Sequence, residues 1–317
     1  MTSARDRVER AAAILGDLAQ RDVSLAPLTT YRVGGCAALF ARPRSVDDLS
    51  LISDALEATL LPVLVVGRGS NLLVADDGFE GLAISLADMS TEHHIVGDQV
   101  LAGAMVALPQ LARQLVAAGL AGFEWAVGVP GSVGGAVRMN AGGHGGDIAT
   151  CLVELQLFDL IRRRHGWLPA SALGLRFRGS DLADHQVVIE ARLQLARGDR
   201  DDSERELAEV VRWRRERQPG GQNAGSVFIN PVPGEVTAGE LIDRSGLRGL
   251  SLGSATVSDK HANFIQGSEG GTSADVRALI DLVRDRVAAD SGFVLRSEVR
   301  LVGFDDHETE PAKGVQW

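Results

Sequence analysis

Three polar side chains lie in apolar or small-residue surroundings, where they could carry proton and charge chemistry. Ser226 lies in the run GSVFINP, Arg178 in the run FRGS, and Glu298 opens the apolar segment of residues 298–304. No GxSxG motif surrounds Ser226 and no histidine belongs to its motif, so a hydrolase nucleophile is not indicated. A serine without a base can still protonate a strongly basic carbanion or enolate. Taken singly, Arg178 and Glu298 are of a type most often found as surface charges, and Ser226 fits a strand-entry serine.

A glycine-containing loop, GRGSNLL at residues 67–73, follows the apolar run PVLVV. Its glycines let the main chain approach a ligand and turn several N–H groups towards it, and Ser70 and Asn71 add polar side chains. This arrangement suits a diphosphate. The loop is not GxGxxG and contains no Walker lysine, so a Rossmann or P-loop site is not indicated. A tight structural turn is the alternative interpretation.

A second glycine-rich segment, residues 128–143, reads GVPGSVGGAVRMNAGG. It alternates glycine with small apolar residues and is too apolar for a flexible linker. We expect it to wrap a flat, partly apolar cofactor, with a helix that begins at Ser132 and faces phosphates. The alternative is a packing helix of small residues. Two such loops in one chain favour a dinucleotide.

Composition limits the remaining classes. The 317 residues carry a formal net charge of −10, which argues against a general nucleic-acid binder. Cys36 and Cys151 are predicted to be small buried residues in a reducing compartment. Residues 1–20 read as a charged amphipathic helix rather than a signal peptide, and no apolar run approaches a membrane span. The sequence therefore predicts a soluble cytoplasmic protein without a membrane partner, and no grouping of residues has metal-site spacing.

Alternating and helical patterns predict an α+β chain. Strands are expected at residues 36–43, 62–66, 81–86, 94–104, 151–157, 187–195, 225–231 and 298–304, and helices at 45–59, 108–120, 237–246 and 272–290. In the strand at 151–157, Cys151, Val153, Leu155 and Leu157 should share one face. The strand at 187–195 should likewise bury Val187, Ile189, Ala191, Leu193 and Leu195. The last helix carries an apolar stripe of Val276, Leu279, Ile280, Val283 and Val287, with Thr272 or Ser273 as its N-cap.

The motifs together resemble the UDP-N-acetylenolpyruvoylglucosamine reductase (MurB) family, in its shorter type. The resemblance begins with LTTYRVGG at residues 28–35 and runs through the two glycine-containing loops, FRGS and RRERQP. It ends with GSVFINP, AGELIDRSGLRG, SDKHANFI and SEVRLVG. So many separated motifs in one order are highly specific.

This resemblance implies an α+β fold with a FAD-binding domain of the PCMH, or vanillyl-alcohol-oxidase, type, made of two α+β subdomains, and a C-terminal substrate-binding domain. The expected division is an N-terminal helix at 1–24, the FAD-binding domain at 25–198 and the substrate-binding domain at 199–304. The tail at 305–317 is expected to be disordered. The protein is expected to be a monomer.

The resemblance also implies a reaction. NADPH reduces non-covalently held FAD, and hydride then passes to the enolpyruvyl group of UDP-N-acetylglucosamine enolpyruvate, which gives UDP-N-acetylmuramate for peptidoglycan. Ser226 matches the serine that delivers the proton, and Arg178 and Glu298 match the other catalytic residues. A guanidinium next to the substrate carboxylate stabilises developing negative charge, and for Glu298 a raised pKa or a bridging water is expected.

Further positions match ligand-contacting stretches of the family. Asn230 and Arg178 fall at substrate contacts. The expected FAD contacts are Tyr31, Arg32, Gly67, Arg68, Gly69, Ser70, Asn71, Leu72, Val129, Pro130, Gly131, Ser132, Gly134, Gly135, Asn140, Gly142, Gly146 and Ile148.

The chain departs from the family pattern at three positions. Ile229 stands where the family often has Lys, which removes a cation near the UDP-sugar, while Phe177 and Gly179 replace the usual Tyr and Asp around Arg178. For His144 and His261, structural roles are favoured over flavin attachment. Two alternatives stay open: a flavin oxidase or dehydrogenase of the same fold that acts on another alcohol or sugar, and a flavin-binding paralogue without turnover.

Overall fold

The computed structural model describes residues 3–304 and 314–316. The prediction of a single N-terminal helix over residues 1–24 is wrong in part. Helix α1 covers Ala4–Leu15 and ends at Gly16, which has a φ of 52°, and β1 at Ala19–Ser24 follows as a strand. A glycine in this conformation reverses the chain, so β1 pairs with the first sheet instead of extending the helix.

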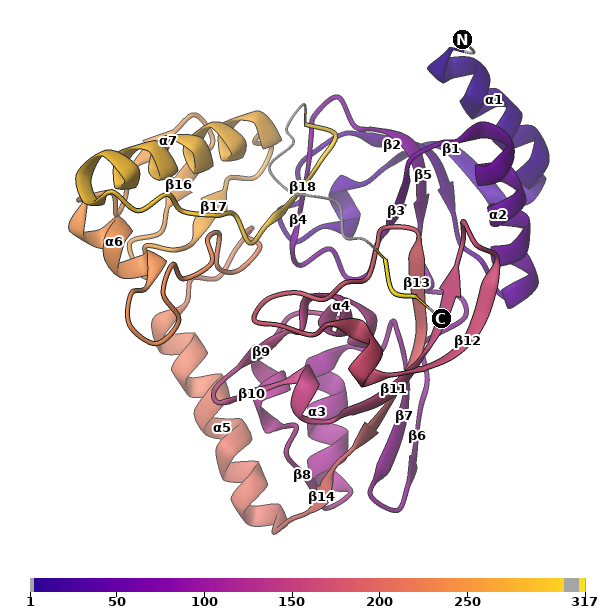
Figure 1. Ribbon diagram of the computed structural model, residues 1–317. Coiled ribbons are helices and arrows are strands. Elements are labelled where there is room, and N and C mark those ends of the chain that lie inside the picture. The colour runs from indigo at the N-terminus through magenta and orange to yellow at the C-terminus, as the bar shows by residue number, and fades with distance from the viewer. Residues whose placement is uncertain (1–2, 305–313, 317) are drawn as a thin grey trace.

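The first subdomain is a four-stranded sheet in the order β1-β2-β5-β3 (Figure 1). β2 covers Cys36–Ala41, β3 Val63–Val65 and β5 Phe79–Ile84. β1 runs antiparallel to β2, while β2 and β3 both run parallel to β5. Helix α2 at Val46–Thr59 connects β2 to β3, so that these two strands enter the sheet on opposite sides of β5 in the same direction. The Ser45 side chain accepts a hydrogen bond from the Asp48 N–H at the start of this helix.

The second subdomain is an antiparallel five-stranded sheet in the order β12-β11-β13-β7-β6. Its strands are β6 (His93–Val96), β7 (Gln99–Gly103), β11 (Leu152–Asp159), β12 (Arg164–Pro169) and β13 (Gln186–Gln194). Helices α3 (Leu108–Ala117) and α4 (Val133–Met139) accompany it, as do the two-residue strands β8 (Leu120–Ala121), β9 (Gly142–Gly143), β10 (Gly146–Asp147) and β14 (Ala196–Arg197).

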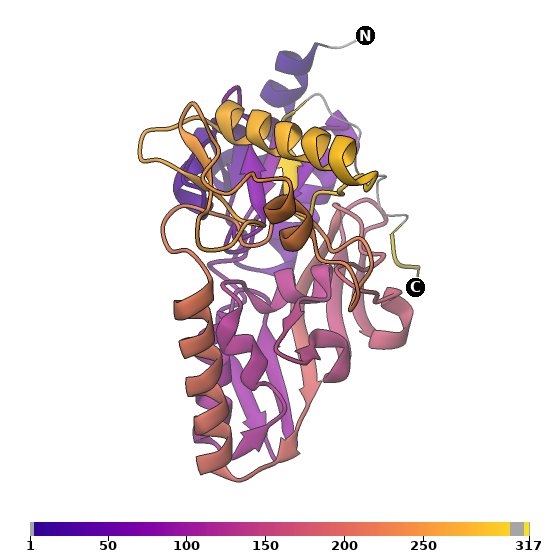
Figure 2. The same ribbon diagram turned by 90° about the vertical axis from the view of Figure 1, so that its left-hand side faces the viewer.

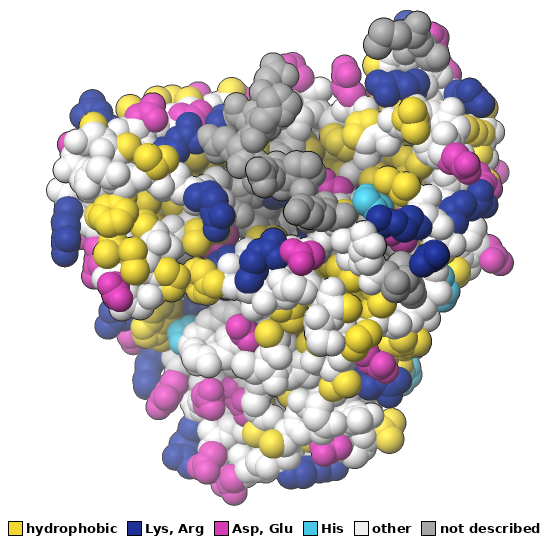
Figure 3. Space-filling model, viewed as in Figure 1, with side chains coloured by type: hydrophobic (Ala, Val, Ile, Leu, Met, Phe, Trp, Pro, Cys, Tyr) yellow, Lys and Arg dark blue, Asp and Glu magenta, His cyan; other side chains and the backbone are white. Residues whose placement is uncertain are grey.

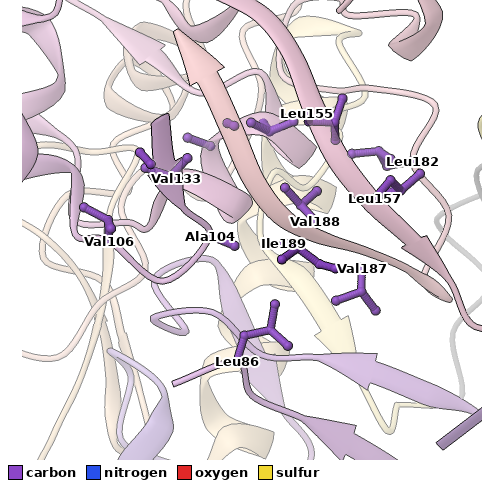
Figure 4. Close-up of a cluster of buried hydrophobic side chains, with 14 of the residues drawn as sticks. Leu86, Ala104, Val106, Val133, Leu155, Leu157, Leu182, Val187, Val188 and Ile189 are labelled. Carbon is purple, nitrogen blue, oxygen red and sulfur yellow. The ribbon is translucent and has the colours of Figure 1, made fainter. Parts of the chain in front are cut away.

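The core of this subdomain tests the predicted alternation. The five residues predicted to be buried in the strand at 187–195 are all buried, four of them in β13 and Leu195 directly after it, so the predicted burial is confirmed. In β11 the prediction is wrong for Val153, which is 41% exposed, because the register shifts between Leu152 and Glu154. Such a bulge turns one side chain out of the alternation. Figure 4 shows the cluster where Leu155 and Leu157 of β11 lie near Val187 and Ile189 of β13.

The C-terminal unit packs a three-stranded sheet against two helices. The sheet is β15-β16-β17 (Ser251–Leu252, Ala255–Val257 and Ile265–Gly267), and the helices are α6 (Ala238–Arg244) and α7 (Ser273–Ser291). All five residues of the predicted α7 stripe are buried, and the Thr272 side chain accepts from the Asp275 N–H as the N-cap. Both predictions are confirmed. The predicted strand around Phe228 is limited to one bridge, with Ser297.

Helix α5 (Arg200–Arg217) runs along the outside of the second subdomain (Figure 2). Its Val210 and Leu207 belong to the core of that subdomain, and the Ser203 hydroxyl donates to the buried Glu124 carboxylate at 2.6 Å. The hydrophobic core of the C-terminal unit takes in Tyr31, Val33 and Leu73 from the first part of the chain, and its next member along the sequence is Ala224, so it includes no residue of α5. We therefore propose that the C-terminal unit begins after α5, near Gln218, rather than at the predicted boundary near Gly198.

The chain returns to the first subdomain at its C-terminal end. β18 (Arg300–Val302) pairs in parallel with β4 (Leu72–Val74), with Arg300 opposite Leu72. Val315 is buried, and its N–H and C=O both bond to the Gln186 side-chain amide at 2.8 Å. The rest of the tail predicted as disordered, 305–313 and 317, lies outside the described residues.

The surface carries both signs of charge, interspersed over the face seen in Figure 3. Cys151 is buried as predicted, but Cys36 is exposed, because it opens β2 at the edge of the apolar run; both are free thiols. Within the described ranges, no helix has the length and apolar character needed to cross a bilayer.

Candidate active site

A cavity of about 600 Å³ lies where the two glycine-containing loops meet the C-terminal unit. This volume is within the usual range of cofactor sites, roughly 300–1,000 Å³. The loop at 67–72, the segment at 128–136 and the turn at 142–144 form one wall, and Ser226, His261 and Glu298 lie on the side of the C-terminal unit. The catalytic residues predicted from the sequence, Ser226, Arg178 and Glu298, all line it.

Arg178 and Glu298 form an ion pair although 120 positions separate them in the sequence (298 − 178). The Arg178 Nε lies 3.2 Å from the Glu298 Oε1, and the Arg178 Nη1 donates to the Gly142 carbonyl at 2.8 Å. Their side chains are 26% and 18% exposed. Burial raises the pKa of Glu298, and the Arg178 charge offsets part of that increase. Protonation of this carboxyl is therefore easier than in water.

The loop that carries Arg178 is fixed by its own backbone. Arg176 and Gly179 exchange backbone hydrogen bonds at 2.9 and 3.1 Å, and the Ser180 hydroxyl donates to the Arg138 carbonyl at 2.6 Å. Arg178 itself has a φ of 56°, which costs a non-glycine residue about 1–2 kcal/mol. The turn thus directs a guanidinium into the cavity at the expense of backbone strain, a combination typical of functional sites.

Ser226 is set in place by its neighbours in the chain. The Val227 N–H donates to the Asn263 carbonyl at 2.9 Å, and the Asn263 side-chain amide bonds to both the N–H and the C=O of Phe228, at 2.9 and 2.8 Å. On the other side, the Glu298 N–H donates to the Val227 carbonyl at 2.7 Å. The segment with Ser226 is therefore held directly beside the segment with Glu298, and the two form one isolated bridge, between Phe228 and Ser297.

Asn71 joins the first glycine-containing loop to the segment that contains Glu298. Its side-chain amide donates to the Glu298 carbonyl at 2.9 Å, and its own carbonyl accepts from the Arg300 N–H at 3.0 Å. Gly69, with a φ of 60°, brings the loop so close to Leu28 that an added Cβ would collide with the Leu28 carbonyl. Sequence reasoning identified this loop as a phosphate site but missed its contact with Glu298.

The cavity is basic in a protein that is acidic overall. Its lining includes five arginines, Arg68, Arg138, Arg178, Arg214 and Arg300, and one carboxylate, Glu298. Asp184 pairs with both Arg138 and Arg300 from outside the lining. Burial, and next the charge of Arg300, lowers the pKa of Arg138, while Asp184 opposes this. Cations gathered in a partly enclosed site favour an anionic ligand.

Comparison with known proteins identifies the family. The C-terminal domain of UDP-N-acetylenolpyruvoylglucosamine reductase matches residues 217–302, and a FAD-binding domain matches residues 37–160. The reductase of Heliobacterium modesticaldum is 43% identical over 87% of this chain and 88% of its own. The chain belongs to the UDP-N-acetylenolpyruvoylglucosamine reductase family. The family member from Gloeobacter violaceus is 41% identical over 95% of this chain and 99% of its own.

A solved structure of the family supports the same fold. The crystal structure of the reductase from Thermus caldophilus aligns with a TM-score of 0.77 and 34% identity, over 89% of this chain and 98% of that one. The predicted fold class, a FAD-binding domain of two α+β subdomains with a family-specific C-terminal domain, is confirmed.

The cavity residues fit FAD. Eight glycines line it, and a Cβ on Gly131 or Gly135 would occupy the space beside the Ser70 or Ser132 hydroxyl, 3.6 Å away in each case. Main chain without side chains can approach a flat ring system and offer N–H groups to a diphosphate. One expectation needs correction: α4 begins after Ser132, but its Val133 and Gly134 N–H groups donate to backbone carbonyls of Val106 and Ala104. Those two groups do not face a phosphate.

Most predicted cofactor contacts line the cavity. They are Gly67, Arg68, Gly69, Ser70, Asn71, Leu72, Val129, Pro130, Gly131, Ser132, Gly135 and Gly142. The other predicted cofactor contacts do not line it: Tyr31, Arg32, Gly134, Asn140, Gly146 and Ile148. Asn230, predicted as a substrate contact, does not line it either. Tyr31 and Ile148 are fully buried. The Asn230 side chain instead accepts from the Ala238 N–H at the start of α6, 3.1 Å away. The ligand roles of all these residues stay predictions.

Helix α5 adds residues that were not predicted as contacts. Trp213, Arg214 and Gln218 line the cavity, and His144 meets the Trp213 ring edge-to-face at 4.8 Å. Burial, and next the charge of Arg214, lowers the pKa of His144. The run RRERQP was noticed only as part of the family resemblance, and its polar composition gave no sign that one side of the helix faces a ligand.

Proposed function

We propose that the protein reduces UDP-N-acetylglucosamine enolpyruvate to UDP-N-acetylmuramate, with FAD as the bound redox cofactor and NADPH as the hydride source. The observation that carries the proposal is the Arg178–Glu298 pair at 3.2 Å in a cavity that Ser226 also lines. Membership of the reductase family and the match to a FAD-binding domain support it. When bound, the flavin supplies two-electron hydride transfer between the nicotinamide and the enolpyruvyl carbon.

Arg178 is suited to hold the substrate carboxylate. Its Nε faces Glu298 and its Nη1 bonds to Gly142, which fixes the plane of the guanidinium and leaves other N–H groups for a carboxylate in the cavity. Negative charge develops next to that carboxylate as hydride adds to the double bond. A cation already fixed in place stabilises this charge without reorganising.

Ser226 is the proposed proton donor to the carbon next to the one that receives hydride. Its neighbours Val227 and Phe228 are hydrogen-bonded to Asn263, so the backbone that carries the Ser226 hydroxyl is held in place. Glu298, whose N–H bonds to the Val227 carbonyl and whose carboxyl has a raised pKa, can hold a proton or orient the hydroxyl. This pairing of a proton donor with a cation suits reduction of an enol ether and has no evident use in an alcohol oxidase.

Separate measurement of the two half-reactions tests the proposal. In Ser226→Ala, NADPH should still bleach the flavin at the normal rate, because no proton is needed there. Reoxidation by the UDP-sugar should slow by about 10²–10⁴-fold, the usual value of a positioned general acid. Equal slowing of both steps would contradict the role of Ser226. Reduced wild-type protein that ignores the sugar but reacts rapidly with oxygen, and is reduced by an alcohol, would support the oxidase alternative.

A cytoplasmic location and a monomeric state are also proposed. Cell fractionation tests the first, and light scattering coupled to size-exclusion chromatography tests the second.

A further inference from the structure

His261 lies in a loop, residues 258–264 (SDKHANF), that is hydrogen-bonded to the segment with Ser226. In this loop the backbone and side chain of Asn263 make the three hydrogen bonds to Val227 and Phe228 described above. Asn263 is 4% exposed, so these bonds are shielded from water. At the start of the loop, the Ser258 hydroxyl accepts from the His261 N–H at 3.4 Å. The loop is therefore fixed relative to the segment that contains Ser226.

The ring of His261 has a defined orientation. Its Nδ1 accepts from the Asn263 N–H at 3.2 Å, so the proton of the neutral ring lies on Nε2. The Phe264 ring packs against it at 4.8 Å, and both side chains line the cavity. Among the residues that the structure describes, nothing accepts a hydrogen bond from this Nε2. His261 therefore brings one N–H without a described acceptor to the lining of the cavity, and the bond to Nδ1 fixes the position of its ring.

The charge state suits a neutral donor. Burial, and next the Arg248 guanidinium, lowers the pKa of His261, so the ring is uncharged at neutral pH. The arginines of the cavity already supply positive charge, whereas a neutral His261 would add a directional hydrogen bond. A neutral N–H pairs well with a carbonyl or phosphate oxygen. A UDP-sugar that enters from the C-terminal unit carries both kinds of oxygen.

We propose that His261 is a recognition residue for the nucleotide sugar, whose Nε2–H donates a hydrogen bond to an acceptor oxygen of the bound substrate. The inference rests on the proposed function and adds a specificity contact to it. It goes beyond the trio of Ser226, Arg178 and Glu298, because His261 acts on binding and not on proton or hydride transfer.

The test compares His261→Phe, which keeps a ring beside Phe264 but removes the donor, with His261→Gln, whose amide can still donate. For His261→Phe we expect the dissociation constant of UDP-N-acetylglucosamine enolpyruvate, measured by calorimetry on the FAD-loaded enzyme, to rise about ten- to hundredfold. For His261→Gln we expect a rise of only a few-fold. Flavin content and the rate of reduction by NADPH should stay normal in both. His94→Gln, on the exposed hairpin of β6 and β7, is the matched control.

Three results would overturn the inference: sugar binding by His261→Phe within about twofold of wild type, equal weakening by both variants, or an equal loss in the NADPH half-reaction. Calorimetry with UDP and with UDP-N-acetylglucosamine separates phosphate or uracil acceptors from those of the enolpyruvyl group. Wild-type enzyme that neither binds nor reduces the sugar would contradict the proposed function itself. Normal wild-type behaviour with an unaffected His261→Phe contradicts only the role of His261.

Discussion

Replacing Arg178 with lysine should slow the sugar half-reaction and leave the NADPH half-reaction intact. The guanidinium serves two fixed partners at once, the Glu298 carboxylate at 3.2 Å and the Gly142 carbonyl at 2.8 Å, while further N–H groups face the cavity. An ammonium donates from a single atom and cannot reproduce this planar fork. Arg178→Lys keeps the charge next to Glu298 and the same backbone conformation, so folding should change little.

The magnitude follows from the contacts that are lost. If the ammonium stays with Glu298 and Gly142, at least one hydrogen bond to the substrate carboxylate is lost. A hydrogen bond to a charged group is worth about 1.5–3 kcal/mol. Since about 1.4 kcal/mol corresponds to a tenfold change in rate, reoxidation of the reduced enzyme by the UDP-sugar should slow about 10- to 150-fold.

The assay is single-turnover mixing of NADPH-reduced enzyme with the sugar, followed by flavin absorbance. Arg192→Lys is the matched control, because Arg192 also pairs with a glutamate, Glu154 at 2.8 Å, and stacks on Trp167, but does not line the cavity. A rate for Arg178→Lys within twofold of wild type would refute the fixed clamp. Equal slowing of both half-reactions would show that the substitution disturbs the flavin instead.

Two further predictions concern stability. Because the folded state raises the pKa of Glu298, the protonated form favours folding, and this contribution is lost as pH rises from about 4.5 through the folded-state pKa. Glu298→Gln should therefore gain stability relative to wild type as pH rises across that window, as measured by urea unfolding; a difference independent of pH would contradict the raised pKa. Gly69→Ala should lose at least about 1–2 kcal/mol and release FAD, because its φ is positive and its Cβ would meet the Leu28 carbonyl. Gly220→Ala, where the space is open, should do neither.

Regular elements were predictable where burial follows a simple period. The stripe of α7 is buried as its spacing predicts, since it lies on one face of an uninterrupted helix. The alternating residues of β13 are buried as well, but Val188 between them is also buried, and the pairing with β11 shifts register at this point. Val153 escaped prediction because a bulge is set by pairing with another strand, which the local sequence does not record. The strand β1 was missed because its residues, AQRDVS, are mostly polar and exposed.

Many residues of the candidate site were predictable from the sequence, but most of the contacts between them were not. The residue types in the glycine-containing loops indicated a dinucleotide, and the family resemblance supplied Ser226, Arg178 and Glu298. The pairing of Arg178 with Glu298, and the bond from Asn71 to the Glu298 carbonyl, join positions more than a hundred residues apart. No periodicity records such contacts. Trp213 and Arg214 were missed because α5 reads as an exposed charged helix, although one side of it borders the cavity.

The parallel pairing of β18 with β4 has a consequence for how the protein is made. β4 is translated early, whereas its partner and the neighbouring Glu298 leave the ribosome more than two hundred residues later. Until then the newborn chain exposes an open strand edge at β4, which is a template for unwanted pairing with other chains. Truncated products that stop before residue 298 would keep both glycine-containing loops but would lack Glu298 and the strand β18 that pairs with β4. We therefore expect such products to be inactive and prone to aggregation.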